Sequence, residues 1–465
     1  MALSSRLHWR VLTSGILALT VIAALGFFSL RHTFAAQNLV QLSSDPYTNI
    51  RNEHQTEVSP ASFAFGSTIV SAFQVGHGNH NGGSTNIGWA TSADNGHSWT
   101  NGFLPHTTKT VKGVYDRVEN PSVAYDAAHK TWMITSNAFI SNNSIAILVS
   151  LSTNGGTSWS NPIAIIQNSS EDLDKNWISC DTTISSPFYG HCYAEWHDER
   201  QANLVQLSTS SDGGLTWGTP LSTANNYAGF NGHPLVQPNG NVIVPINTPL
   251  PSPKPSTTIM AFTSTNGGAS WNSTVKVASV HAHTLGGSLR SLHIFSAGID
   301  GSGKVYLVWE DCRFESGCTA NDLVMTTSTN GTTWSAVKRI PIGPVGSGVD
   351  HFMPGFSVDT ATSGSTAHLG LVYYYLPVAS CDTTTCQLYA GYVSSSNGGN
   401  TWTSSTQLAG PMNVTWLTAT AWGYMVGDYS TMAYSGGLAF PIISVAIAPS
   451  GTTLHQAIYT TSSGL

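Results

Sequence analysis

The sequence predicts an all-β protein, a single β-propeller made of four-stranded blades. A short turn pattern recurs six times, apolar runs of five to eight residues lie around each copy, and only 9% of the residues are charged. Soluble domains usually carry about 25% charged residues, so Ser, Thr, Asn and Gly must supply the polar surface, as is typical of strands and turns. The net charge of −7, with 17 Lys and Arg, excludes the basic face of a nucleic-acid-binding protein.

The first 36 residues are expected to form a segment separate from the propeller. Arg6 and Arg10 precede an uncharged run over residues 11–30, which as a helix would span the roughly 30 Å hydrocarbon core of a membrane. The basic flank predicts that the rest of the chain is exported. Ala35 and Ala36 fit a cleavage site, so a signal peptide and a retained signal anchor both stay open, beside a buried globular helix.

The repeated pattern is a turn that begins with Ser, continues through Asp or Asn and Gly, and ends with Trp. Asp or Asn can accept hydrogen bonds from nearby backbone N–H groups, Gly permits a positive φ, and Trp can fold back over the turn. These roles are structural, and we expect no catalysis from Asp94 or Asp212. From one Asp or Asn to the next, the copies are 54 to 67 residues apart. The six segments, called box turns below, are residues 92–99, 152–159, 210–217, 264–271, 328–334 and 395–402.

The strand runs determine the expected number of blades. In the second repeat they are residues 121–125, 131–135 and 145–149, and a further run follows each box turn. After the sixth box turn only three runs remain before the chain stops. The run at residues 38–42 would complete that last blade and remove two exposed edges. We therefore expect seven blades within residues 37–465, with six as the alternative.

Six cysteines fall into three sequence-local pairs. An even number at close spacing in an exported chain predicts disulfides, and we expect nearest neighbours to pair. Zinc is the competing interpretation, but none of the pairs has the short CxxC spacing of a metal knuckle. The expected bridges are Cys180–Cys192, Cys312–Cys318 and Cys381–Cys386.

The box turns resemble the bacterial neuraminidase repeat, or Asp-box, of the sialidase superfamily, over nearly the whole chain after residue 37. The resemblance implies a propeller of exo-α-sialidase type, whose site holds the sugar carboxylate with three arginines. It also implies a Tyr nucleophile with a Glu partner and an Asp as acid/base. The Phe/Tyr-Arg-Ile-Pro motif that supplies the first arginine in that superfamily is missing, because residues 57–62 read Glu-Val-Ser-Pro-Ala-Ser.

Propeller topology places side chains just ahead of the inner strands around one mouth of the central channel. We expect Asp350 and Asp428 to act as acid and base, and Tyr429 with Glu310 to act as a nucleophile pair. Converging arginines would clamp a carboxylate. The residues expected to bind substrate are Glu57, Arg117, His233, Arg290, Arg313 and His351, and further candidates at this mouth are Asp174 or Lys175, His197, Asp198, Glu199 and Asp311. No cofactor and no metal site are predicted.

Two functions fit these residues. The first is an exported, sialidase-like glycoside hydrolase that acts on cell-surface or extracellular glycans. The second is a non-catalytic propeller that binds a glycan or a protein through the same face. In both cases we expect a monomer that contacts a membrane only through its N-terminal segment.

Overall fold

The computed structural model describes residues 38–49, 52–78, 82–249 and 257–465. The N-terminal segment predicted to target the chain lies outside these residues. The described part is all-β and contains helix only as five three-residue 3₁₀ turns. Within it, no helix has the length and apolar character needed to cross a membrane. The 3₁₀ turns are η1 (Lys109–Val111), η2 (Glu199–Gln201), η3 (Ser316–Cys318), η4 (Gly364–Thr366) and η5 (Val414–Trp416).

The strands form a β-propeller, which confirms the predicted fold class. Five separate sheets of three or four strands are individual blades. Their strands are β10 (Leu173–Cys180), β11 (Cys192–Asp198) and β12 (Leu204–Ser210); β13 (Leu235–Val236), β14 (Val242–Asn247), β15 (Thr258–Ser264) and β16 (Val275–Ser279); β17 (Ser296–Ile299), β18 (Val305–Asp311), β19 (Asp322–Ser328) and β20 (Lys338–Arg339); β21 (Asp350–Val358), β22 (Leu369–Leu376), β23 (Gln387–Ser395) and β24 (Thr406–Asn413); and β27 (Thr431–Ser435), β28 (Leu438–Ser450), β29 (Thr453–Thr461) and β1 (Leu39–Gln41).

A further sheet has eight strands and consists of two successive four-stranded units. The units meet through a single residue pair, Ser84 with Val118. A small two-stranded hairpin lies outside these sheets and is formed by β25 (Thr418–Thr420) and β26 (Gly423–Met425). The strands of the eight-stranded sheet are β2 (Glu57–Phe65), β3 (Thr68–His77), β4 (Ser84–Ser92), β5 (Thr100–Phe103), β6 (Arg117–Asp126), β7 (Thr131–Ile140), β8 (Asn143–Ser152) and β9 (Ile163–Gln167).

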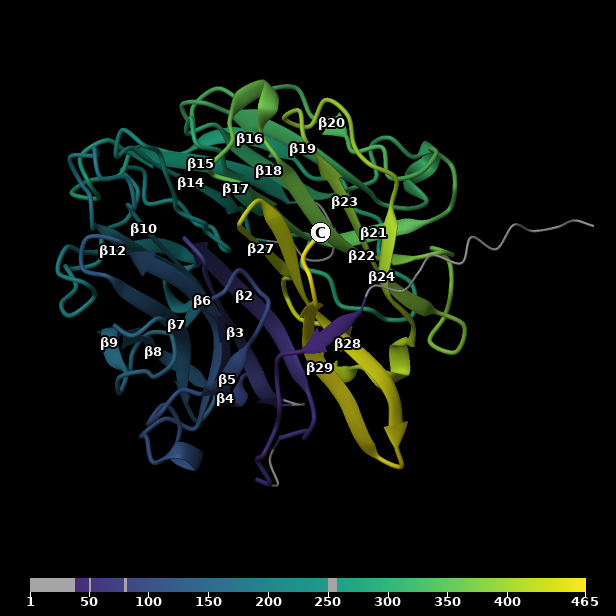
Figure 1. Cartoon of the computed structure of the whole chain (residues 1–465), viewed down its shortest axis with the longest axis horizontal. Helices are drawn as coiled ribbons and strands as arrows, with labels where there is room; N and C mark the ends of the chain where they lie inside the picture. Colours follow the sequence, from purple (N-terminus) through teal and green to yellow (C-terminus); the bar gives the residue numbers. More distant parts are fainter. Residues whose placement is uncertain (1–37, 50–51, 79–81, 250–256) are drawn as a thin grey trace, which may run out of the picture. The chain divides into compact units, whose positions relative to one another are not determined.

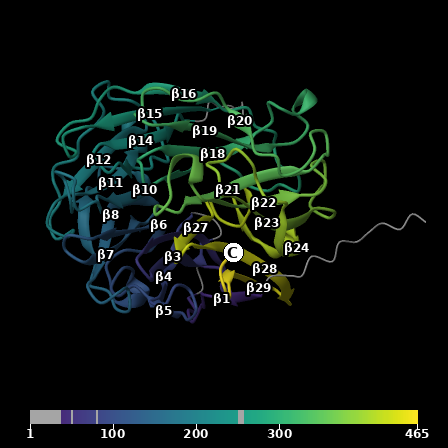
Figure 2. The same cartoon turned by 45° about the horizontal axis from the view of Figure 1, so that its top comes forward.

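The first strand of each unit lies at the centre of the propeller. In chain order β2, β6, β10, β13, β17, β21 and β27 each contact the next, and β27 contacts β2. Figures 1 and 2 show the sheets succeeding one another in this order, from purple to yellow. The N-terminal strand β1 pairs antiparallel with the last strand β29, with Leu39 opposite Thr461. The two ends of the described chain therefore meet in one blade.

The box turns have the hydrogen bonds that their residue types predict. In the first, the Asp94 carboxylate accepts from the Ser98 N–H at 2.9 Å, and the Trp99 indole donates to the Gly96 carbonyl at 3.1 Å. Gly96 has φ +80°, and an added Cβ would lie 2.2 Å from the Phe440 ring. Hydrogen bonds from Ser98 and Ser92 lower the pKa of the exposed Asp94 to about 2. The acidic side chain is thus committed to the turn, as expected.

The three predicted disulfides are confirmed. Cys180 and Cys192 are directly opposite each other on β10 and β11, and the other two bridges close loops with sequence separations of 6 and 5. Free cysteines are absent from the described chain. The sulfur atoms are therefore not available as zinc ligands.

Candidate functional site

Bulges in the inner strands aim side chains into the channel mouth. The pairing of β2, β6, β10 and β21 with their neighbours shifts register near the start of each strand. One residue in each shift has positive φ, namely Ser59, Asn120, Lys175 and Met353. A bulge interrupts the alternation of a strand and redirects the side chains next to it. Pro follows three of these four residues, which is the local signal for the irregularity.

A pocket of about 330 Å³ opens beside these bulges and gathers charged side chains from several sheets. It is the candidate functional site, and we call it the mouth pocket. Its lining residues are Gln74, His77, Gly82, Glu119, Phe139, Asp174, Lys175, Glu199, Arg290, Thr420, Ala421, Trp422, Met425 and Asp428.

An ion triad forms the floor of the mouth pocket. Asp428 accepts from the Lys175 ammonium and from Arg290 Nη2, which lies 2.8 Å from Oδ1 and 2.9 Å from Oδ2. Burial alone would raise the pKa of Asp428, but Arg290 and Lys175 outweigh it and lower the pKa to about 2. Burial in turn opposes the charge of Lys175, yet Asp428 and Asp174 keep its pKa above the ordinary value. Asp428 and Lys175 are therefore charged at neutral pH.

Carboxyl groups lie next to this triad. An oxygen of Asp174, an oxygen of Glu199 and a ring nitrogen of His197 lie within 4.8 Å of one another. Asp174 and His197 are opposite each other on β10 and β11, and Glu199 begins η2 immediately after β11. The Asp174 carboxylate accepts from Asn120 Nδ2 at 2.6 Å and from the Lys175 N–H at 2.7 Å. Asp174 is thereby fixed, whereas Glu199 is exposed at the mouth.

Two carboxyl groups of the mouth pocket have raised pKa values. Glu199 is exposed as a residue, but partial desolvation of its carboxyl group in the pocket, followed by the charge of Asp174, raises its pKa to about 7. The same two causes, in the same order, raise the pKa of Glu119 to about 7, and Glu119 Oε2 also accepts from the Gly83 N–H at 2.8 Å. Carboxyl groups with pKa values so far from those of ordinary carboxylates are suited to donating a proton at neutral pH.

The histidines of the site are neutral at physiological pH. Burial lowers the pKa of His77 to about 4, with Arg290 as the second cause. Burial likewise lowers the pKa of His197 to about 4. Neither imidazole is therefore suited to proton donation near pH 7, and the carboxyl groups are the better candidates.

Tyr429 does not line the mouth pocket, and its expected role as nucleophile is corrected. Its hydroxyl donates to the Pro121 carbonyl at 3.1 Å, and its ring contacts Trp177 within the core. Burial raises its pKa well above the ordinary value, so the phenol is not activated. The ring of His233 also packs against Trp177, with ring centroids 4.4 Å apart, and burial lowers the pKa of His233 to about 3.

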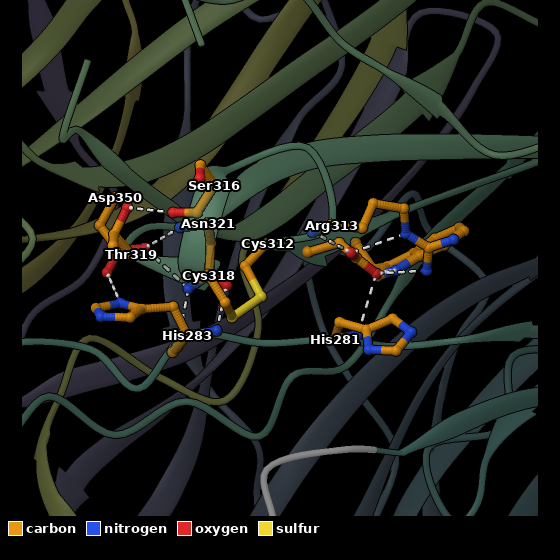
Figure 3. The surroundings of a disulfide bond; sticks show 11 residues. His281, His283, Cys312, Arg313, Ser316, Cys318, Thr319, Asn321 and Asp350 are labelled. Atoms are coloured by element: carbon orange, nitrogen blue, oxygen red, sulfur yellow. Dashed lines mark hydrogen bonds and ion pairs between the residues drawn. A yellow bond between two sulfur atoms is a disulfide. The ribbon is translucent and has the colours of Figure 1, made fainter. Parts of the chain in front are cut away.

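Asp350 and Glu310 form a separate, buried cluster. Asp350 accepts from the Asn321 backbone and side chain, both at 2.8 Å, and pairs with His283 Nδ1 at 2.8 Å, as Figure 3 shows beside the Cys312–Cys318 disulfide. Glu310 accepts from Ser291 at 2.6 Å and the Met353 N–H at 2.9 Å, and it pairs with His293. Both carboxylates are almost wholly buried and hydrogen-bonded within the fold. The expected pairing of Glu310 with Tyr429 is therefore also corrected.

The three candidate arginines have separate partners. Only Arg290 lines the mouth pocket. Arg117 donates to the Ser141 carbonyl at 2.8 Å and packs over the Phe139 ring. Arg313 forms a two-point ion pair with Asp311 beside the disulfide in Figure 3. The expected joint clamp of these arginines is not assembled among the described residues.

Glu57 and His351 are also buried away from the mouth pocket. Glu57 accepts from Ser43 at 2.7 Å, and burial raises its pKa to about 8. His351 lies against the rings of Tyr373 and Tyr375, and burial lowers its pKa to about 4. These two side chains are part of the packing between strands rather than of the site.

Glu119 and Trp422 line the site but were not predicted from the sequence. The only local signal for Glu119 is the Asn120–Pro121 pair that marks the bulge after it. Trp422 belongs to the β25–β26 hairpin, which lies outside the repeat, so the repeat pattern gives no indication of its place.

Solved structures with a similar fold are known, whereas no protein-family model and no curated protein matches the chain. A polysaccharide lyase of family PL25, described as an ulvan lyase, aligns at a TM-score of 0.52 and 10% identity over 92% of this chain and 96% of its own. The Hadza microbial sialidase Hz136 aligns at 0.46 and 14% identity, over 89% of this chain and 66% of its own. A leech intramolecular trans-sialidase aligns at 0.48 and 12% identity, over 72% and 67%. At these identities the likeness concerns the fold alone.

Proposed function

We propose that the protein is an exported glycoside hydrolase and that the mouth pocket is its active site. The main support for this proposal is the pair of carboxyl groups on Asp174 and Glu199. An oxygen of one lies within 4.8 Å of an oxygen of the other in an open pocket. Glycoside hydrolysis uses two carboxyl groups at the scissile bond, and a spacing of about 5–5.5 Å is typical of retaining enzymes.

The two carboxyl groups have different environments, which supports different roles. Glu199 keeps its proton near neutral pH and lies at the mouth, so it is the proton donor to the leaving oxygen. Asp174 is held by Asn120 and lies beside the Lys175 ammonium, so it is the carboxylate that attacks the anomeric carbon. The resulting glycosyl ester on Asp174 is then cleaved by water, which gives its proton to Glu199.

The positive charge of Lys175 is relevant to metal binding, because Asp174, His197 and Glu199 are residue types that can hold a metal ion. Its ammonium pairs with Asp428 and is also among the groups that stabilise the charged forms of Glu119 and Glu199. A positive charge is thus already present where a divalent cation would otherwise supply one. We therefore assign the three side chains to acid–base chemistry.

The proposal departs from the sialidase mechanism implied by the sequence resemblance. That mechanism requires an accessible tyrosine and a clamp of arginines. Here the Tyr429 hydroxyl is engaged by a backbone carbonyl, and Arg117, Arg290 and Arg313 have separate partners. Hydrolysis of sialic acid is for these reasons not part of the proposed activity.

Three further features belong to the proposal: the number of blades, the export of the chain and its monomeric state. We propose that the eight-stranded sheet is two blades, so that the ring has seven, because its two units meet through only one residue pair and the inner strands contact one another in a closed order. Three disulfides are typical of exported proteins. We propose that the N-terminal segment directs this export and that the exported chain is a monomer.

The proposed function is tested by screening fluorogenic glycosides of neutral sugars together with a sialoside. We expect turnover of at least one neutral glycoside, and a rate that falls as the pH rises through about 7, because Glu199 must retain its proton. Binding of a glycan without turnover of any glycoside would instead support the non-catalytic propeller. A rate that rises with pH across this range would contradict the role of Glu199.

A further inference from the structure

Trp422 is an unusually exposed aromatic side chain at the rim of the mouth pocket. It is 80% exposed, whereas Phe65 and Phe314 are 41% and 37% exposed. It lies in the turn of the β25–β26 hairpin and lines the mouth pocket together with Thr420 and Ala421. A large apolar ring left in water at the edge of a charged pocket is typical of a ligand contact.

Hydrogen bonds fix the backbone of the hairpin that carries Trp422. The Trp422 backbone N–H donates to Thr420 Oγ1 at 3.0 Å, and that hydroxyl donates to the Gly423 carbonyl at 2.8 Å. The Tyr424 N–H donates to the Ser288 carbonyl, and the Arg290 N–H donates to the Tyr424 carbonyl. The hairpin is therefore bonded to the segment that carries Arg290. An aromatic side chain has only two side-chain torsions, so ordering it on binding costs little conformational entropy.

The charges of the mouth pocket indicate which ligand this ring would face. Its two strong cations, Lys175 and Arg290, are both paired with Asp428. The remaining ionisable groups around the opening are Glu119, Asp174 and Glu199, together with the neutral His77. Carboxyl groups form hydrogen bonds with sugar hydroxyls whether or not they are protonated. A sugar carboxylate would lie beside Asp174, and Lys175 and Arg290 of the pocket lining already pair with Asp428.

We propose that Trp422 is a stacking platform for a neutral sugar ring, and that the mouth pocket therefore binds neutral glycans and discriminates against sialic and uronic acids. The C–H face of a sugar would lie on the negative face of the indole, with its hydroxyl groups directed to Asp174 and Glu199. This inference rests on the proposed function only in placing the sugar in the mouth pocket. Binding to Trp422 can be measured whether or not the protein hydrolyses the sugar.

Binding of defined oligosaccharides tests the inference. Calorimetric titrations would compare cellohexaose, xylohexaose, mannohexaose and arabinohexaose with 3′-sialyllactose and oligogalacturonate, using Glu199→Gln protein so that hydrolysis does not interfere. We expect at least one neutral oligosaccharide to bind more tightly than both acidic ones. In the same background, Trp422→Ala should weaken that binding about tenfold or more, and Trp422→Tyr should restore most of it.

Ile184→Ala is the matched control, because Ile184 is a similarly exposed apolar side chain, 82% exposed, that does not line the mouth pocket. This variant should bind like its parent. Equal affinity in the Trp422→Ala protein, tighter binding of an acidic oligosaccharide, or no binding of any neutral one would overturn the inference. Stacking by Trp422 in a protein without hydrolytic activity would uphold the inference and refute only the proposed function.

Discussion

Replacing Asp428 with Asn is expected to destabilise the protein by about 3–5 kcal/mol, the range found when one partner is removed from a buried ion pair. The side chains of Asp428 and Lys175 are only 6% and 7% exposed. Without the Asp428 charge, the ammonium of Lys175 and the guanidinium of Arg290 would face each other without their shared partner. Chemical denaturation at pH 7 measures the loss directly.

Asp212→Asn is the matched control for this substitution. Asp212 occupies the third position of a box turn, and Asn stands at that position in four of the six box turns. We expect the free energy of unfolding of this control to change by no more than about 0.5 kcal/mol. The double variant Lys175→Met with Asp428→Asn should regain part of the loss, because no unpaired ammonium remains buried. A loss below about 1 kcal/mol for Asp428→Asn alone would contradict the role of the triad.

The lowered pKa of Asp428 predicts how the free energy of unfolding changes in acid. The pKa of Asp428 is lowered to about 2 in the folded protein. A lowered folded-state pKa contributes stability that is complete above the ordinary pKa of about 3.9 and is lost as the pH falls through about 2. The Asp428→Asn protein should therefore show a smaller loss of stability than the wild type between pH 4 and pH 2.

Replacing Glu199 with Gln is expected to reduce kcat by about 10²- to 10⁴-fold on a glycoside with a poor leaving group, the usual contribution of general acid catalysis. Gln has nearly the shape of Glu but cannot give a proton to the leaving oxygen. The alkaline fall of the rate near pH 7 should vanish in this variant. On a dinitrophenyl glycoside, whose leaving group needs little protonation, the reduction should be much smaller.

Asp174→Asn separates the two proposed roles. It removes the attacking carboxylate, so both classes of glycoside should lose activity to a similar extent. Glu171→Gln is the control from the segment just before β10, because Glu171 bonds to Asn168 and does not line the mouth pocket. It should retain wild-type activity. If Glu199→Gln lost activity equally on both leaving groups, Glu199 would not be the acid.

Features fixed by local chemistry could be predicted from the sequence, and those fixed by strand register could not. The box turns and the three disulfides depend on residues close in sequence, and both are as predicted. Arg290 and Asp428 also lie at the mouth, as expected. Tyr429 is only one residue beyond Asp428, yet its side chain enters the core. Both residues lie between β26 and β27, outside the strands, so no alternation pattern indicates which side chain faces the pocket. Within a strand, a bulge shifts the alternation of side chains.

Glu119 and Trp422 illustrate the same limit. The position of Glu119 depends on the bulge at Asn120, whose location becomes evident only from the pairing of β6 with β7. Trp422 depends on a hairpin that has no counterpart in the repeat. Asp350 starts β21 and Glu310 lies next to the end of β18, but both carboxyl groups accept hydrogen bonds from neighbouring groups of the fold.

In the proposed mechanism, Asp174 is the nucleophile of a retaining glycosidase and Glu199 is its acid. Mass spectrometry of the wild-type protein after incubation with 2-deoxy-2-fluoroglycosyl fluorides of the neutral sugars it hydrolyses tests this most directly. We predict a mass increase of one fluorosugar, carried by the peptide that contains Asp174. Continued hydrolysis without a trapped sugar, or a sugar attached to any other residue, would contradict it.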